Sequence, residues 1–162
     1  MVSLGREVIA PLPRADGARL SAAFDALSVR TIRIEAVLAQ MKFDVTQFSV
    51  APGEDVEIVF VNKDHMPHNL LVTSPGKLEA VSLKAEAMVS QPDGFQKHFV
   101  PETPDVLHAT HLINHDEIAR LRFVAPTDAG KYPYVCTFPG HWRTMNGVMD
   151  VVKPAAPTEA RR

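Results

Sequence analysis

The stretch CTFPGHWRTM, residues 136–145, joins two segments that are both predicted to be β-strands, 132–136 and 147–152. It carries a thiol, an imidazole and a thioether at Cys136, His141 and Met145. Soft sulfur ligands suit Cu(I) and imidazole suits both oxidation states, so two histidines, one cysteine and a weakly bound methionine make up a blue-copper ligand set. The loop supplies only one histidine, and such a site therefore requires a second histidine from elsewhere in the chain.

His68 is the candidate for that second histidine. It stands in the sequence MPHN at 66–69, after the strongly apolar segment 56–61 and a short loop. A strand as apolar as 56–61 is expected to be buried on both faces, and a residue that follows it closely can be held rigidly. Taken singly, each of the four residues could be an ordinary core or turn residue, but their joint spacing favours a metal site.

Short strands separated by turn residues dominate the chain from residue 30 onward. Residues 77–90 are the exception, because their apolar positions recur at helical spacing. The pattern predicts an all-β, Greek-key β-sandwich of about seven or eight strands with one helical insertion. The expected strands lie at 32–37, 43–50, 56–61, 69–73, 106–113, 119–123, 132–136 and 147–152.

Both ends of the chain differ from this pattern. Residues 1–29 are predicted to be a linker with a short helix over 18–27, and residues 154–162 a flexible tail rich in Pro and Ala. The β domain is placed at 30–153. The first twenty residues contain no basic segment followed by an apolar one, so no secretory signal is expected within this sequence.

Composition limits the function classes. The 162 residues are 46% hydrophobic and 22% charged, with a net charge of -2. This balance does not suit nucleic-acid binding, and the apolar runs are too short for membrane insertion. Cys136 is the single cysteine, which excludes an internal disulfide and leaves either an inert buried thiol or a chemically used one.

Three motifs resemble those of blue copper proteins. The spacing Cys-Thr-Phe-Pro-Gly-His-x-x-x-Met resembles the ligand loop of the azurins, and Pro67-His68-Asn69 resembles the first-ligand motif of plastocyanins and auracyanins. The stretch VLHATHLI at 106–113 resembles the azurin strand that follows a helical flap. The resemblance extends over about residues 41–152 and implies a cupredoxin (type 1 blue copper) fold.

The resemblance also implies a role for each matching residue. One copper ion would be bound by Nδ1 of His68 and His141, by the thiolate of Cys136, and by Met145 as a distant axial ligand. Asn69 matches the residue that ties the two ligand loops together, and its amide would donate toward the cysteine sulfur. The amide of Phe138 would be a second donor, and Thr137 would help to hold Asn69.

Some residues depart from the azurin pattern. Azurins carry a glycine before the first histidine, and its carbonyl approaches the copper; Pro67 stands there, so a four-coordinate, plastocyanin-like site is expected. Residues 142–144 also differ from azurin and resemble cupredoxin domains near the C-terminal end of large bacterial multi-domain proteins. A domain of a larger redox protein is therefore one interpretation.

The expected function is outer-sphere electron transfer through the edge of the His141 ring. Four protein ligands leave no open position for a substrate, and the His-x-His pairs of multicopper enzymes are absent from the sequence, so an electron carrier is favoured over an enzyme. The resemblance implies a monomeric, periplasmic or otherwise extracytoplasmic domain. Its redox partner would be a cytochrome c-like protein or a fused or adjacent dehydrogenase domain.

Two alternatives to a free carrier remain open. One is a copper-delivery module without redox turnover, which Cys136 disfavours, and the other is an electron-relay domain of a larger dehydrogenase. Trp142 could either pack in the interior or join Met66, Pro67 and Pro139 in an apolar docking rim. His65 is expected to be a solvated loop residue, and a second metal site at His108, His111 or His115 is a less favoured hypothesis.

Overall fold

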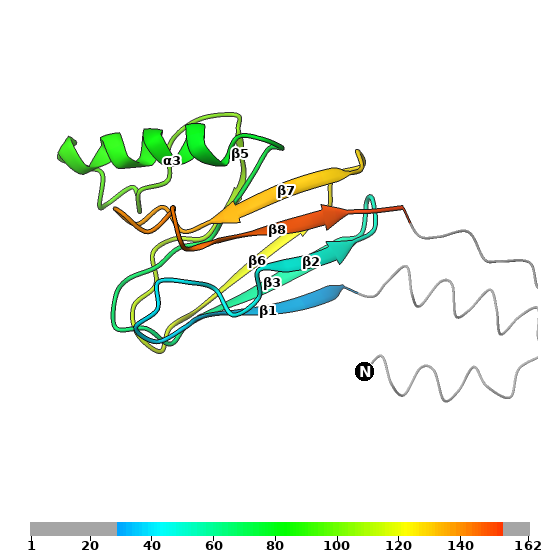
Figure 1. Ribbon diagram of the computed structural model, residues 1–162, viewed down its shortest axis with the longest axis horizontal. Coiled ribbons are helices and arrows are strands. Elements are labelled where there is room, and N and C mark those ends of the chain that lie inside the picture. Colours follow the sequence, from blue (N-terminus) through cyan, green and yellow to red (C-terminus); the bar gives the residue numbers. More distant parts are fainter. Residues whose placement is uncertain (1–28, 154–162) are drawn as a thin grey trace, which may run out of the picture. The chain divides into compact units, whose positions relative to one another are not determined.

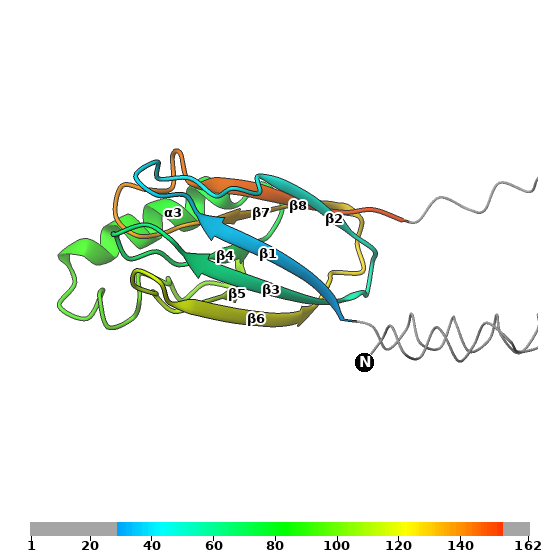
Figure 2. The same cartoon turned by 90° about the horizontal axis from the view of Figure 1, so that it is seen from below.

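The computed structural model describes residues 29–153, which form two facing β-sheets (Figures 1 and 2). The smaller sheet has the strand order β1-β3-β6 and the larger one β2-β8-β7-β4-β5. The bounds of the strands are β1 Arg30–Ala36, β2 Gln47–Val50, β3 Asp55–Asn62, β4 Leu71–Thr73, β5 Val106–Ala109, β6 Ile118–Val124, β7 Gly130–Val135 and β8 Asn146–Val151. The eight strands confirm the predicted all-β sandwich.

Alternation along the strands fills the space between the sheets. Ile34 of β1 and Ile58 and Phe60 of β3 meet Tyr134 of β7 and Met149 of β8 in one buried cluster. Every residue of β3 from Val56 to Asn62 is buried, which confirms that this strand is covered on both faces. Burial of this apolar surface is the main stabilising contribution to such a sandwich.

The predicted helical insertion is also confirmed. Helix α3 spans Leu78–Ala87 and continues as a short 3-10 turn, η1, over Met88–Ser90. Leu71 of β4 and Val135 of β7 form an apolar cluster with Val81 of the helix. The helix therefore covers the outer face of the larger sheet, as Figure 1 shows. No helix in the range 29–153 is long and apolar enough to cross a bilayer.

Three strands are shorter than the sequence pattern predicts. The predicted strand 43–50 is regular only over β2, and Phe43 pairs with Ala36 in an isolated bridge. The predicted strands 69–73 and 106–113 form ladder pairs only within β4 and β5, and His68 and Ile113 then pair in an isolated bridge. Between these two places, the N–H of Leu70 donates to the hydroxyl of Thr110 at 2.9 Å rather than to a backbone carbonyl. A side-chain oxygen thus interrupts the regular ladder just beside the candidate site.

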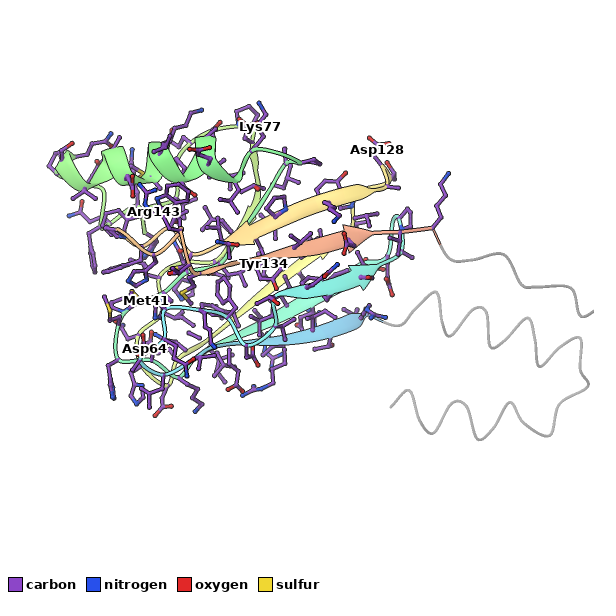
Figure 3. The ribbon with its side chains drawn as sticks, viewed as in Figure 1. Met41, Asp64, Lys77, Asp128, Tyr134 and Arg143 are labelled. Atoms are coloured by element: carbon purple, nitrogen blue, oxygen red, sulfur yellow. The ribbon has the colours of Figure 1, made fainter. Side chains whose placement is uncertain are left out.

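The loops between the strands separate into two ends of the sandwich. The connections β1–β2, β3–β4 and β7–β8 meet at one end, which Figure 3 marks by Met41, Asp64 and Arg143. The chain enters β1 and leaves β8 at the opposite end, where Asp128 is labelled. The predicted short helix at 18–27 and the tail at 154–162 lie outside the described residues.

Candidate metal centre

Three of the predicted ligands lie together at the end of the sandwich where these loops meet. Sγ of Cys136 is 3.6 Å from Nδ1 of His68 and 3.8 Å from Nδ1 of His141, and the two nitrogens are 3.2 Å apart. All three side chains are buried. Among the described residues, they are the only group of three or more His, Cys, Asp or Glu side chains whose ligand atoms converge in this way.

The size of this triangle fits a metal ion. An ion at its centre would lie about 2 Å from each atom, close to the nitrogen and thiolate bond lengths of first-row metal ions. One sulfur and two imidazole nitrogens in a trigonal arrangement are the donors that copper prefers when it changes oxidation state. The residues therefore fit a copper ion.

The loop from β7 to β8 closes on itself and places Met145 next to the other two residues. The N–H of His141 donates to the carbonyl of Phe138 at 3.0 Å, and the N–H of Met145 donates to that of His141 at 2.9 Å. The carbonyl of Met145 in turn accepts from the N–H of Cys136 at 3.0 Å. Gly140 allows the turn, since its φ of +83° is one that other residues rarely adopt. The side chain of Met145 is fully buried at this position.

His68 is held through both its backbone and its ring. Its N–H and carbonyl exchange hydrogen bonds of 3.1 and 2.8 Å with Ile113. Its Nε2 lies 3.0 Å from a carboxylate oxygen of Asp64, and its Nδ1 faces Cys136 and His141. Nε2 of the ring therefore contacts Asp64, and Nδ1 faces the metal centre.

Asn69 and Thr137 connect the two ligand loops. Oδ1 of Asn69 accepts from the N–H of Thr137 at 2.8 Å, and its Nδ2 donates to Oγ1 of Thr137 at 2.9 Å. The same two side chains also bind the segment after α3, because Nδ2 of Asn69 donates to the carbonyl of His98 and the hydroxyl of Thr137 to that of Phe99. His98 and Phe99 both have positive φ, a strained conformation that these hydrogen bonds help to hold.

Burial governs the protonation of the donor atoms in the metal-free protein. It raises the pKa of Cys136 to about 12, although the backbone N–H groups of Asn69 and Phe138 act against the increase. Burial also lowers the pKa of His141 to about 4 and lowers the pKa of His68, which Asp64 partly offsets. Near neutral pH the triangle thus holds a thiol and two neutral imidazoles, and a metal ion must displace the thiol proton.

Known proteins share this arrangement. Residues 30–152 match the family model of copper binding proteins of the plastocyanin/azurin family. The chain is 30% identical over 123 residues to auracyanin-A of Chloroflexus aurantiacus, covering 75% of this chain and 74% of the relative. The chain belongs to the plastocyanin/azurin family of copper-binding proteins.

Solved structures of cupredoxins from this family have the same fold. Auracyanin A from Chloroflexus aurantiacus, described as a "blue" copper protein, has a TM-score of 0.70 and 31% identity, covering 77% of this chain and all of that one. Reduced auracyanin from Roseiflexus castenholzii has a TM-score of 0.67 and 25% identity, covering 77% and 98%. The protein is therefore a type 1 copper cupredoxin that carries electrons rather than an enzyme, as the sequence motifs predict.

The remaining histidines are accounted for without a second cluster of three ligands among residues 29–153. His108 stacks on Phe123 with ring centroids 4.4 Å apart, and burial lowers its pKa. His111 lies 5.8 Å from His98, and His115 lies 4.8 Å from His65, again between ring centroids. Each is a pair at most, and His65 is exposed, as expected of a loop residue.

Most of the contacts of Trp142 are with the larger sheet and helix α3. The half-buried indole contacts the cluster of Leu71, Val81 and Val135, and its Nε1 donates to Glu86 of α3 at 2.7 Å. The guanidinium of Arg143 lies 4.3 Å from the centre of the indole ring. Of the two interpretations of Trp142, the contacts favour packing over docking.

Sequence reasoning missed the contacts of Asp64 and Glu86. Asp64 precedes His68 by four residues, but it lies in a loop, where no spacing rule predicts that the two side chains meet. Glu86 reaches a residue 56 positions away. The residue types around Asp64, which include Asn62 and Lys63, give no signal that would single out this carboxylate.

Proposed function

We propose that His68, Cys136, His141 and Met145 hold one type 1 copper ion and that the protein exchanges single electrons through the His141 ring. The triangle of buried nitrogen and sulfur atoms is the observation that carries this proposal. Bound there, copper would supply a Cu(II)/Cu(I) couple. The chain's own residues would fix its donors in one arrangement for both oxidation states.

Met145 is proposed as the axial ligand because its backbone is hydrogen-bonded to the backbones of Cys136 and His141. Pro67, in the place of the azurin glycine, supports a four-coordinate site. Four side chains would leave no position open for a substrate, which is consistent with transfer at the surface.

His141 is proposed as the point of electron exchange. It is 2% exposed, whereas His68 is completely buried, so of the two histidines His141 lies nearer to the solvent. Its ring packs against Phe138 at 4.9 Å, Phe138 against Phe99 at 5.8 Å, and Phe99 against Phe95 at 6.2 Å, measured between centroids. Phe95 is 63% exposed, so a series of packed rings leads from the ligand to the solvent.

The surface at this end is proposed as the docking site for a redox partner protein. Leu38, Met41 and Met66 are exposed apolar side chains on the β1–β2 and β3–β4 connections, and the exposed Phe95 packs against Phe99, which is bonded to Thr137. Weak electron-transfer complexes bury small interfaces, and a small apolar surface permits fast dissociation. A c-type cytochrome, or a dehydrogenase domain in the same or another chain, is the kind of partner proposed.

The alternative of a copper-delivery module is disfavoured by burial. A protein that passes its metal on needs accessible donors, whereas Cys136, His68 and His141 are at most 2% exposed. The relay-domain version shares the same site and differs only in its partner. An extracytoplasmic location is proposed from the auracyanin relatives.

Spectroelectrochemistry tests the proposed function. The copper-loaded protein should lose its visible absorption on reduction and regain it on oxidation, with one electron per copper over repeated cycles. A loaded protein that releases its copper on reduction, or that cannot be cycled, would support delivery over electron transfer. Cys136→Ser should bind no copper in the cycling form.

A further inference from the structure

Asp64 is a buried carboxylate that lies against the outer nitrogen of His68. The residue is 4% exposed, and the whole side chain of His68 is inaccessible. One carboxylate oxygen, Oδ2, is 3.0 Å from Nε2 of the ring. A buried carboxylate is costly unless it is paired and hydrogen-bonded, so a contact of this kind has to be sustained by its surroundings.

The surroundings of Asp64 leave the carboxylate little freedom. Its second oxygen, Oδ1, accepts hydrogen bonds of 2.9 Å from the backbone N–H groups of Ala39 and His65. The N–H of Asp64 itself donates to the side chain of Asn62 at 2.8 Å. Asn62 is fully buried and donates to the carbonyls of Met66 and Ile113. Asp64 is thereby fixed to the β1–β2 connection and to its own β3–β4 connection, which also carries His68.

The direction of these hydrogen bonds determines the form of the histidine. The two backbone groups that contact the carboxylate can only donate, which favours its ionised form as the acceptor. An ionised carboxylate requires the hydrogen of the neutral imidazole on Nε2. Nδ1 then keeps its lone pair, and Nδ1 is the atom that faces Cys136 and His141.

We infer that Asp64 is a positioning residue that fixes the tautomer and orientation of His68 and lowers the reduction potential of the copper. The inference rests on the proposed ligand role of His68. A negative charge separated from the metal by one imidazole stabilises Cu(II) more than Cu(I), because the oxidised ion carries the larger charge. It also makes the imidazole a stronger donor, with the same sign of effect.

Replacement of the charge tests the inference. Asp64→Asn keeps the shape of the side chain and an oxygen acceptor but removes the charge. The copper-loaded variant should stay blue and have a higher reduction potential than the unaltered protein. At a fixed solution potential near the midpoint, its ratio of oxidised to reduced copper should fall several-fold.

Asp150→Asn is the matched control. Asp150 is also a buried carboxylate that accepts a hydrogen bond, from Gln47, but it belongs to the end of β8 that pairs with Lys131, away from the ligand loops. Its replacement should leave the potential unchanged. Equal potentials in Asp64→Asn and Asp150→Asn would overturn the inference.

A second measurement needs neither a variant nor copper. Nitrogen-15 NMR of the metal-free protein reports the tautomer of His68 directly, and it should show a slowly exchanging hydrogen on Nε2. A hydrogen on Nδ1 would overturn the inference even if the protein binds copper as proposed. Conversely, a failure to form a blue copper site would contradict the proposed function, but the NMR measurement of the His68 tautomer would still test the role of Asp64.

Discussion

The side-chain amide of Asn69 is hydrogen-bonded to both the backbone and the side chain of Thr137. Its Oδ1 accepts from the N–H of Thr137 at 2.8 Å, and its Nδ2 donates to Oγ1 of Thr137 at 2.9 Å. The two residues stand 68 positions apart in the sequence, and each directly follows a proposed copper ligand. The geometry of the two ligand loops therefore depends on one buried side chain.

Asn69→Ala should destabilise the metal-free protein by about 3 kcal/mol, because buried donors and acceptors would be left without partners. Urea unfolding followed by circular dichroism measures this change. Asn114→Ala, at an exposed asparagine, is the control and should cost no more than about 0.5 kcal/mol. Equal costs for the two variants would show that Asn69 does not brace the loops.

The bond from Trp142 to Glu86 predicts a structural role for the indole. Trp142→Phe removes the donor and should lower the free energy of unfolding by about 1 kcal/mol, with little change in the rate of electron self-exchange. Glu86→Ala should cost a similar amount, while Glu86→Gln, which keeps an acceptor, should cost less. A variant Trp142→Phe that unfolds normally but exchanges electrons slowly would instead favour docking.

Replacement of the exposed Phe95 should change the rate of electron transfer but not the reduction potential of the copper. Phe95→Ala should slow self-exchange between oxidised and reduced protein several-fold, because it removes an exposed ring from the proposed contact surface. The visible spectrum and the reduction potential should not change. NMR line broadening in mixtures of the two oxidation states measures the rate.

The control for Phe95 is Val124→Ala. Val124 is a comparably exposed apolar residue, at the end of β6 that pairs with the start of β3, away from the ligand loops. A similar loss of rate in both variants would place the contact surface elsewhere.

Glu57 predicts one component of the pH dependence of stability. Hydrogen bonds from Arg122, opposed by burial and aided by Arg120, hold the pKa of Glu57 below its ordinary value. A lowered pKa stabilises the folded protein above the unfolded-state pKa of 4.5, and this contribution is lost as the pH falls through the folded-state pKa. Glu57→Gln should therefore destabilise the metal-free protein more at pH 7 than at pH 3.

Urea unfolding at the two pH values measures this difference. Ser49→Ala, at an exposed and uncharged residue of β2, is the control; it removes no titrating group and should have the same effect at both pH values. A constant difference between Glu57→Gln and the unaltered protein from pH 7 to pH 3 would contradict the assignment.

The parts of the site that the sequence predicted are those with local or residue-type signals. Cys136, His141 and Met145 share one short loop, and their spacing alone defines a ligand set. His68 required one long-range step, from the chemical need for a second imidazole. The alternation of apolar residues predicted the strands, because a strand with one buried face repeats every two residues.

The unpredicted parts depend on backbone geometry. The carbonyls of His98 and Phe99 accept hydrogen bonds from the ligand loops. Every residue has a backbone carbonyl, so the sequence does not indicate which ones take part. The hydroxyl of Thr110 replaces a backbone acceptor and ends the regular pairing of β4 and β5, which the apolar pattern could not indicate. The contact of Asp64 with His68 likewise requires the path of the loop to be known.

The electron paramagnetic resonance spectrum of the protein loaded with one equivalent of Cu(II) distinguishes a type 1 site from ordinary copper binding. We expect an intensely blue protein with a small parallel copper hyperfine splitting, because the Cys136 thiolate would share the unpaired electron in a trigonal site. A colourless adduct with the large splitting of ordinary tetragonal Cu(II) would contradict this expectation.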